Sequence, residues 1–133
     1  EHSIIVLKEI FNQNHRKLVS IYIKDIKDEL YGDISYLESL TKFVKNKDNK
    51  LIIIVGAGNI MDEGTYLGEL IYSKNALENV KIIFPNKNLF PDIKNFTISD
   101  SNAVRIVDIN GRGFASFNHK QMVLDLRNRI NEI

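Results

Sequence analysis

The chain has 133 residues, of which 44% are hydrophobic, and its 18 basic and 17 acidic residues give a net charge of +1. This length and composition are typical of one domain with a real hydrophobic core, which excludes an intrinsically disordered chain. The balanced charge gives no general attraction to nucleic acid, although it does not exclude a local basic patch. The absence of cysteine excludes disulfides, thiolate metal ligands and cysteine nucleophiles.

No segment predicts membrane insertion or export. The longest apolar runs, Ile4–Leu7 and Leu51–Val55, are far too short to span a bilayer. The start lacks the basic region and the small-residue cleavage site of a signal peptide. We therefore expect a soluble, cytoplasmic protein. The chain begins at Glu1 without a methionine, so we expect a single domain, residues 1–133, cut from a longer protein.

The first part of the chain alternates predicted helices and strands. Apolar residues recur at helical spacing over roughly the first fourteen residues, which predicts a helix. Leu18–Ile23 is rich in β-branched and aromatic residues and predicts a strand. Asp33 is the expected N-cap of a second helix that runs to about Lys45, and the polar stretch Lys45–Lys50 predicts a turn.

The middle of the chain continues this alternation. Leu51–Val55 is apolar at every position, as in a strand that is buried on both faces. Apolar residues from Tyr66 to Ile71 mark a third helix, and Val80–Phe84 predicts a third strand. Asn86–Asp92 has the composition of a loop, and Phe96–Ile98 predicts a short strand.

The last part predicts a hairpin followed by a helix. Ala103–Asp108 is a β-branched strand, and Gly113–Phe117 is the expected return strand. Asn110-Gly111 between them favours a type I′ turn, in which both central residues have positive φ. Met122–Ile130 predicts the closing helix. The element order predicts an α/β fold: a mixed, mainly parallel sheet with helices on both faces.

Gly56-Ala57-Gly58 follows a strand and invites comparison with a dinucleotide-binding loop. The third glycine of that fingerprint is absent, because Met61 occupies its position. No acidic residue closes a second strand about twenty residues further on, as the fingerprint requires. A strand-to-helix loop explains the glycines better, and the sequence indicates no cofactor.

The histidines and the lysine cluster have ordinary structural explanations. His2, His15 and His119 lie in different predicted elements without the spacing of metal ligands, so no metal site is expected. His119 opens the last helix. A cluster of lysines at the end of the second helix favours the helix dipole, with a phosphate or membrane patch as the alternative: Lys42, Lys45, Lys47 and Lys50.

The segment 101–118, SNAVRIVDINGRGFASFN, resembles the signature region of the phospholipase D superfamily. Members of that superfamily carry His-x-Lys-x-x-x-x-Asp, a short hairpin and then Gly-Ser-x-Asn. Asp108 falls on the aspartate, and Ala115–Asn118 falls on the Gly-Ser-x-Asn segment. The element order from Ile4 to Val55 also matches the superfamily, so the resemblance covers nearly the whole chain.

The chain departs from this pattern where the chemistry is done. The positions of the catalytic histidine and lysine are held by Ser101 and Ala103. A serine without a base is a poor nucleophile, and alanine supplies no charge to a phosphoryl transition state. The resemblance therefore implies a phospholipase D-like half without the superfamily's catalytic pair.

One cation lies near the altered positions. We expect residues 101, 103 and 105 to lie on the same strand face, because strand side chains alternate, and this places Arg105 on the side of the lost catalytic groups. Arginine is a good phosphate ligand. We therefore expect Arg105, Asp108, Ser116 and Asn118 to form a ligand-binding remnant. The alternative is that Arg105 makes a structural ion pair.

The resemblance leaves three functions open. The leading one is a non-catalytic module that binds a phosphate-bearing ligand, nucleic acid included, or that serves in protein assembly. The second is a divergent phosphodiesterase or nuclease that uses other groups, with His119 as a candidate. The third is a purely structural interaction domain of a larger protein. Because active members join two halves, the resemblance also implies a homodimer or docking on another domain.

Overall fold

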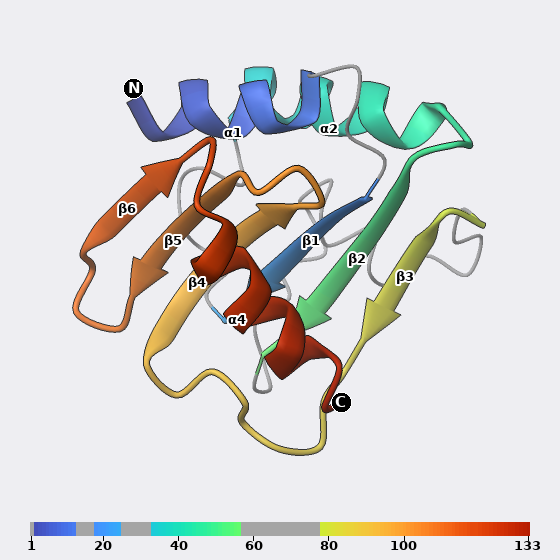
Figure 1. Ribbon diagram of the computed structural model, residues 1–133. Coiled ribbons are helices and arrows are strands. Elements are labelled where there is room, and N and C mark those ends of the chain that lie inside the picture. Colours follow the sequence, from blue (N-terminus) through green and yellow to red (C-terminus); the bar gives the residue numbers. More distant parts are fainter. Residues whose placement is uncertain (1, 13–17, 25–32, 57–77) are drawn as a thin grey trace.

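The computed structural model of the protein describes residues 2–12, 18–24, 33–56 and 78–133. The helices in these ranges are α1 (His2–Asn12), α2 (Ile34–Lys45) and α4 (Lys120–Ile130). The strands are β1 (Leu18–Ile23), β2 (Lys50–Val55), β3 (Val80–Ile83), β4 (Ile93–Ser99), β5 (Val104–Asp108) and β6 (Gly113–Ser116). They form one six-stranded sheet in the order β3-β2-β1-β4-β5-β6 (Figure 1).

The sheet is mixed, as predicted, but it is not mainly parallel. β1 pairs with β2, and β2 with β3, in parallel, whereas β1–β4, β4–β5 and β5–β6 are antiparallel. The error comes from β4, because the sequence indicated only Phe96–Ile98 where the strand runs from Ile93 to Ser99. The chain returns from β3 through a loop rather than through a crossover helix, so β4 lies antiparallel beside β1.

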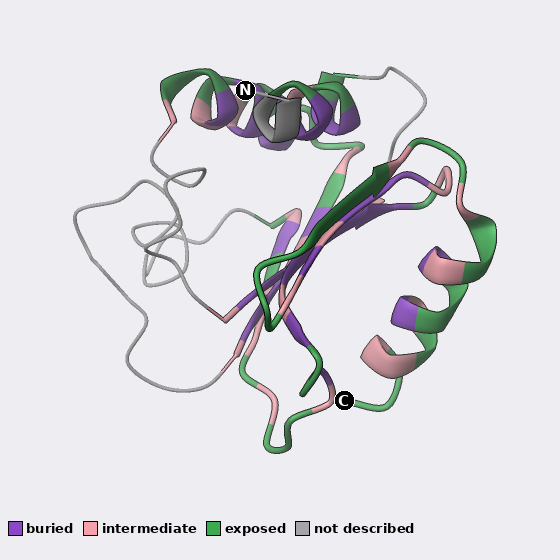
Figure 2. Ribbon diagram, turned by 90° about the vertical axis from the view of Figure 1, so that its left-hand side faces the viewer, coloured by how far each residue is buried: buried purple, intermediate pink, exposed green. Residues whose placement is uncertain are grey.

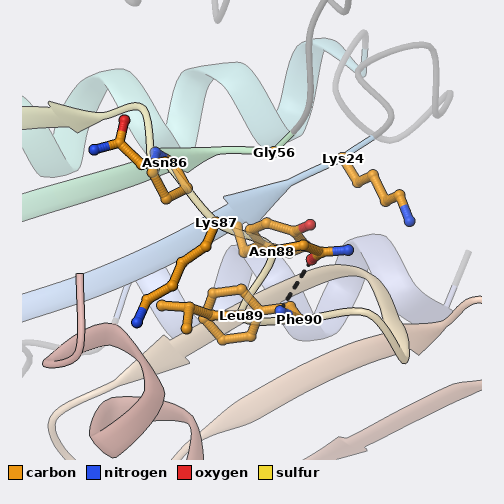
Figure 3. Close-up of a pocket in the computed structure, with 9 residues that line it drawn as sticks. Lys24, Gly56, Asn86, Lys87, Asn88, Leu89 and Phe90 are labelled. Carbon is orange, nitrogen blue, oxygen red and sulfur yellow. Dashed lines mark hydrogen bonds between the residues drawn. The ribbon is translucent and has the colours of Figure 1, made fainter.

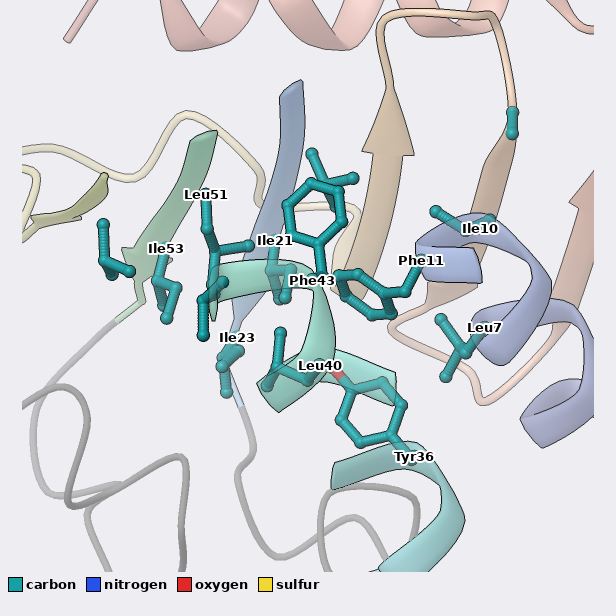
Figure 4. Packing of buried hydrophobic residues seen from close by; sticks show 14 of the residues in the cluster. Leu7, Ile10, Phe11, Ile21, Ile23, Tyr36, Leu40, Phe43, Leu51 and Ile53 are labelled. Carbon is teal, nitrogen blue, oxygen red and sulfur yellow. The ribbon is translucent and has the colours of Figure 1, made fainter. Parts of the chain in front are cut away.

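Helices cover both faces of the sheet, as predicted. α1 and α2 lie over one face and α4 lies along the other (Figure 2). The buried apolar side chains form two clusters, one on each face of the sheet (Figure 2). The first cluster packs α1 and α2 against residues such as Ile21 and Ile53 (Figure 4). The second cluster packs α4 against residues such as Ile54 and Phe96. Because Ile53 and Ile54 belong to different clusters, the prediction that β2 is buried on both faces is confirmed.

Several local predictions are confirmed. The Asp33 side chain accepts a hydrogen bond from the Tyr36 backbone N–H at 2.9 Å and caps α2, which ends at Lys45. β1 has the predicted bounds. The expected third helix around 66–71 lies outside the described residues, as does the expected continuation of the first helix beyond Asn12. In the described ranges, no helix is long and apolar enough to cross a bilayer.

The predicted type I′ turn between β5 and β6 is wrong. Gly111 has a φ of 83°, but Asn110 is not among the positive-φ residues of the described chain. The Gly111 N–H donates to the Asp108 carbonyl at 3.0 Å, and the Asp108 N–H donates to the Arg112 carbonyl at 2.9 Å. These bonds define a three-residue loop in which only the last position is left-handed, a position that suits glycine.

Candidate functional site

Arg105 is the second residue of β5 and faces the side of the sheet that α1 and α2 cover. It is directly opposite Thr97 on β4, and Thr97 is directly opposite Ile21 on β1. Directly paired residues present their side chains on the same face, and Ile21 belongs to the first cluster. Arg105 is only 7% exposed. The sequence predicted that Arg105 lies on the same side of the strand as the expected catalytic positions, but it did not show that the residue is buried.

A polar strip runs along β4 beside Arg105. It consists of Asn95, Thr97 and Ser99, which alternate onto the same face and are at most 2% exposed. Asn95 Oδ1 accepts a hydrogen bond from the Lys24 backbone N–H at 3.1 Å, and Ser99 Oγ accepts one from the Ala103 N–H at 3.3 Å. Buried polar side chains normally need such partners. The strip therefore gives the interior around Arg105 hydrogen-bonding groups in place of hydrocarbon.

The Arg105 guanidinium has no counter-charge in the described part of the chain. The ion pairs found there involve Arg129 with Asp92 and with Asp125, and no hydrogen bond engages the Arg105 side chain. The structural ion pair considered as an alternative is thus not seen among these residues. An arginine keeps its charge in a protein, and a largely buried residue screens that charge less well than bulk water does. The Arg105 nitrogens are not among the fully buried side-chain atoms that lack a partner in the described chain, so the guanidinium retains some contact with solvent.

The structure does not bring the other predicted ligand-binding residues to Arg105. Ser116 is directly opposite Val104, a member of the second cluster, so it faces the α4 side of the sheet. The Asn118 backbone N–H donates to Ser116 Oγ at 3.2 Å, so these two residues are neighbours. Asp108 Oδ1 accepts hydrogen bonds from the backbone of the following turn, at 2.9 Å each, and stabilises it.

The residues at the expected catalytic positions occupy two different environments. β5 begins at Val104, so Ser101 lies in the preceding turn and not on the strand, contrary to the prediction. That turn includes Asn102, whose φ of 70° shows why the strand cannot extend back through it. Ala103 is fully buried in the first cluster.

His119 caps α4. Its Nδ1 accepts a hydrogen bond from the Met122 backbone N–H at 3.1 Å, which leaves only Nε2 for other contacts. The His119 ring also packs edge-on against Phe114, with centroids 5.6 Å apart. Across the described residues, no group of histidine and acidic side chains could hold a metal ion. The geometry thus gives His119 a structural role at the start of the helix.

A pocket that the sequence analysis missed lies at the carboxyl ends of β1, β2 and β3 (Figure 3). Its volume is about 180 Å³. It is lined by Tyr22, Lys24, Gly56, Pro85, Asn86, Lys87, Asn88, Leu89 and Phe90. Ligands of open α/β sheets usually bind at the carboxyl ends of parallel strands. Part of the signal was present in the sequence, because Lys24 directly follows β1 and Gly56 directly follows β2, whereas β3 is followed by Phe84 and Pro85 before Asn86.

The floor of the pocket depends on a close contact at Gly56. A Cβ atom at this position would lie 2.8 Å from Tyr22 Oη and 3.2 Å from the Ile23 carbonyl oxygen, so a larger residue would displace one of them. The Tyr22 ring packs against Phe90 and Phe96, with centroid distances of 4.7 and 5.5 Å. Burial raises the pKa of the Tyr22 hydroxyl, which keeps it protonated as a hydrogen-bond donor.

An ion pair holds the pocket loop to α4. Arg129 Nη1 donates to Asp92 Oδ1 at 2.9 Å, and its guanidinium carbon lies 6.0 Å from the centre of the Phe90 ring. Asp92 ends the loop that begins after β3, and Phe90 lines the pocket. The loop is therefore fixed at its far end.

Asp92→Asn is expected to lower the free energy of unfolding near neutral pH by about 0.2–1 kcal/mol, the range for exposed ion pairs. The hydrogen bond from Arg129 lowers the pKa of Asp92 below its ordinary value of 3.8. A lowered folded-state pKa stabilises the fold above 3.8, and this contribution is lost as the pH falls below that value. Urea denaturation at several pH values should show wild type and variant converging in acid. A difference that persists there would argue against the ion pair.

A comparison of the chain with protein families, with curated proteins and with solved structures finds no match.

Proposed function

We propose that this chain is a non-catalytic, phospholipase D-like binding module that holds a phosphate-bearing ligand at Arg105. The observation that carries the proposal is a guanidinium on a residue only 7% exposed, with no counter-charge among the described residues. A bound anion would supply that counter-charge. Two parallel N–H donors of a guanidinium match two oxygens of a phosphate, which makes arginine suited to this ligand.

The polar strip on β4 supports the same proposal. Thr97 is directly opposite Arg105 and only 2% exposed, and no hydrogen bond engages its hydroxyl in the described ranges. A hydroxyl on the same face as the guanidinium can donate to another oxygen of the ligand. Leucine or valine would be the ordinary choice at such a buried position. The pair of residues thus resembles an anion site more than a packing contact.

Arg105→Met tests the proposal, because methionine keeps the long apolar stem and removes the charge. Without ligand, we expect the free energy of unfolding of the variant to exceed that of wild type by up to about 1 kcal/mol, since a cation without a counter-charge among the described residues is removed from a largely buried position. Dimethyl phosphate at about ten times its dissociation constant should raise the free energy of unfolding of wild type by about 1.4 kcal/mol. It should leave that of the variant unchanged. Thermal and urea denaturation measure both effects.

Arg112→Met is the matched control, because Arg112 is exposed in the β5–β6 turn. This variant should keep both the stability and the phosphate response of wild type. If Arg105→Met kept the full response to dimethyl phosphate, Arg105 would not be the ligand site. If Arg105→Met were strongly destabilising without ligand, the guanidinium would have a structural role instead.

The divergent phosphodiesterase remains the second candidate, and a sensitive assay on a generic phosphodiester and on nucleic acid separates the two. If wild type showed turnover and the His119→Ala variant did not, the proposed non-catalytic role would be contradicted. The structure offers that histidine one open nitrogen, Nε2, because Nδ1 is engaged by Met122. The homodimer that the resemblance implies stays a prediction, which light scattering on concentrated protein tests.

A further inference from the structure

We infer that the pocket at the carboxyl ends of β1, β2 and β3 is a second binding site, one that takes a small organic dianion such as a phosphate monoester or a dicarboxylate. It is separate from the proposed site at Arg105. Tyr22 and Phe90 of the pocket belong to the second cluster, on the α4 side of the sheet, whereas Arg105 faces the first cluster. The inference therefore does not depend on the proposed function.

The charges of the pocket favour an anion. Lys24 and Lys87 are both part of its lining, and no carboxylate is among the described residues that line it. The two lysines flank the pocket and extend to different sides of it (Figure 3). Each ammonium group sits on a flexible four-carbon stem, so both can turn toward a bound ligand. Two cations around one small cavity favour a ligand with two negative charges over a neutral one.

The backbone holds Lys24 at the pocket edge. Its N–H lies 3.1 Å from both the Lys94 carbonyl oxygen and Asn95 Oδ1, directly after β1. The neighbouring Gly56 N–H donates to the Ile23 carbonyl at 2.8 Å and fixes the end of β2 against the end of β1. The wall that carries Lys24 is thus part of the sheet.

Neutral donors complete the polar side of the pocket. Tyr22 is 2% exposed, and its hydroxyl reaches the pocket wall beside Gly56. Asn88 Oδ1 accepts from the Phe90 backbone N–H at 3.1 Å, so its amide nitrogen is left as a donor. A hydroxyl and an amide on the pocket wall can each donate a hydrogen bond to a ligand oxygen.

The size and the apolar walls limit the ligand. A volume of about 180 Å³ suits a small molecule of roughly ten non-hydrogen atoms. Pro85, Leu89 and Phe90 form apolar walls that can contact its carbon atoms. The ligand class is therefore a short carbon chain with a doubly charged end or with two charged ends.

Titration of the ¹⁵N-labelled chain with glycerol 3-phosphate, succinate and glycerol tests the inference. We expect saturable shifts of the Gly56, Asn88 and Phe90 amides with one or both dianions, with a dissociation constant on the order of 1 mM. The dianion that binds more tightly identifies the source as a phosphate ester or a dicarboxylate. Glycerol, which has no charge, should cause no saturable shift. Unsaturated shifts with both dianions would overturn the inference.

Lysine variants localise the binding. The double variant Lys24→Met, Lys87→Met should raise the dissociation constant of the tighter-binding dianion at least about tenfold, because it removes both charges and keeps the apolar stems. Lys81→Met is the matched control, since Lys81 is exposed on β3 and is not part of the pocket lining. Equal weakening by Lys81→Met would contradict a specific pocket.

Discussion

Phe96→Ala is expected to lower the free energy of unfolding by about 3–5 kcal/mol, the usual range for a buried phenylalanine. Phe96 is fully buried at the centre of the second cluster. Its ring lies 5.5 Å from that of Tyr22 and 5.1 Å from that of Phe90, centroid to centroid. The substitution leaves a cavity beneath both rings, which urea denaturation should report as a lower midpoint with an unchanged slope.

Phe114→Ala is the matched control, because Phe114 is 44% exposed on β6. Loss of the Phe114 ring should lower the free energy of unfolding by no more than about 1 kcal/mol, since folding buries less apolar surface of Phe114 than of Phe96. Tyr22 and Phe90 also line the pocket, so Phe96→Ala should weaken dianion binding there as well. Similar effects of both substitutions on stability would contradict the packing of the second cluster.

The elements that the sequence predicted well have strong local signals. Asp33 could be recognised as a cap because a side-chain oxygen before an amphipathic stretch satisfies a free N–H of the first turn. β1 could be recognised from its β-branched and aromatic residues. Both signals depend on neighbours in the chain, and the helix or strand that results is largely independent of the rest of the fold.

β4 lacked such a signal. Polar Asn95, Thr97 and Ser99 alternate with apolar residues, but their face of the sheet is buried and they are at most 2% exposed. A strand whose polar face is solvated and one whose polar face is buried have the same pattern in sequence. Only the tertiary structure shows that this face turns inward beside Arg105. The sequence could therefore single out Arg105 as a candidate but could not indicate its polar surroundings.

The grouping of the other site residues depends on strand register. Arg105 is directly opposite Ala115, so the next residue, Ser116, points to the opposite face. An expectation based on spacing along the chain cannot fix this, because a shift of one residue exchanges the faces. The strand-end pocket has the same origin: Lys24, Gly56 and Lys87 are far apart in sequence and meet only because three parallel strands end together.

Burial of β2 on both faces leads to the second large effect. We expect the substitutions Ile53→Asp and Ile54→Asp each to lower the free energy of unfolding by at least about 5 kcal/mol. A loss of this size approaches the whole stability of a typical domain of this size. Ile53 and Ile54 are both fully buried, but they pack in different clusters on opposite faces of the sheet. A strand with one solvated face would tolerate one of the two substitutions. Circular dichroism and urea denaturation of both variants measure the effect.

Lys50→Asp provides the control, because Lys50 begins the same strand but is exposed, and its replacement should change stability by less than about 1 kcal/mol. The pH dependence gives a second check. Burial raises the pKa of a carboxyl group, so in the folded state each introduced aspartate should bind its proton at higher pH than in the unfolded state. Both variants should then recover stability relative to wild type as the pH falls through the raised pKa. Recovery by one variant alone would place only that side chain in an apolar interior.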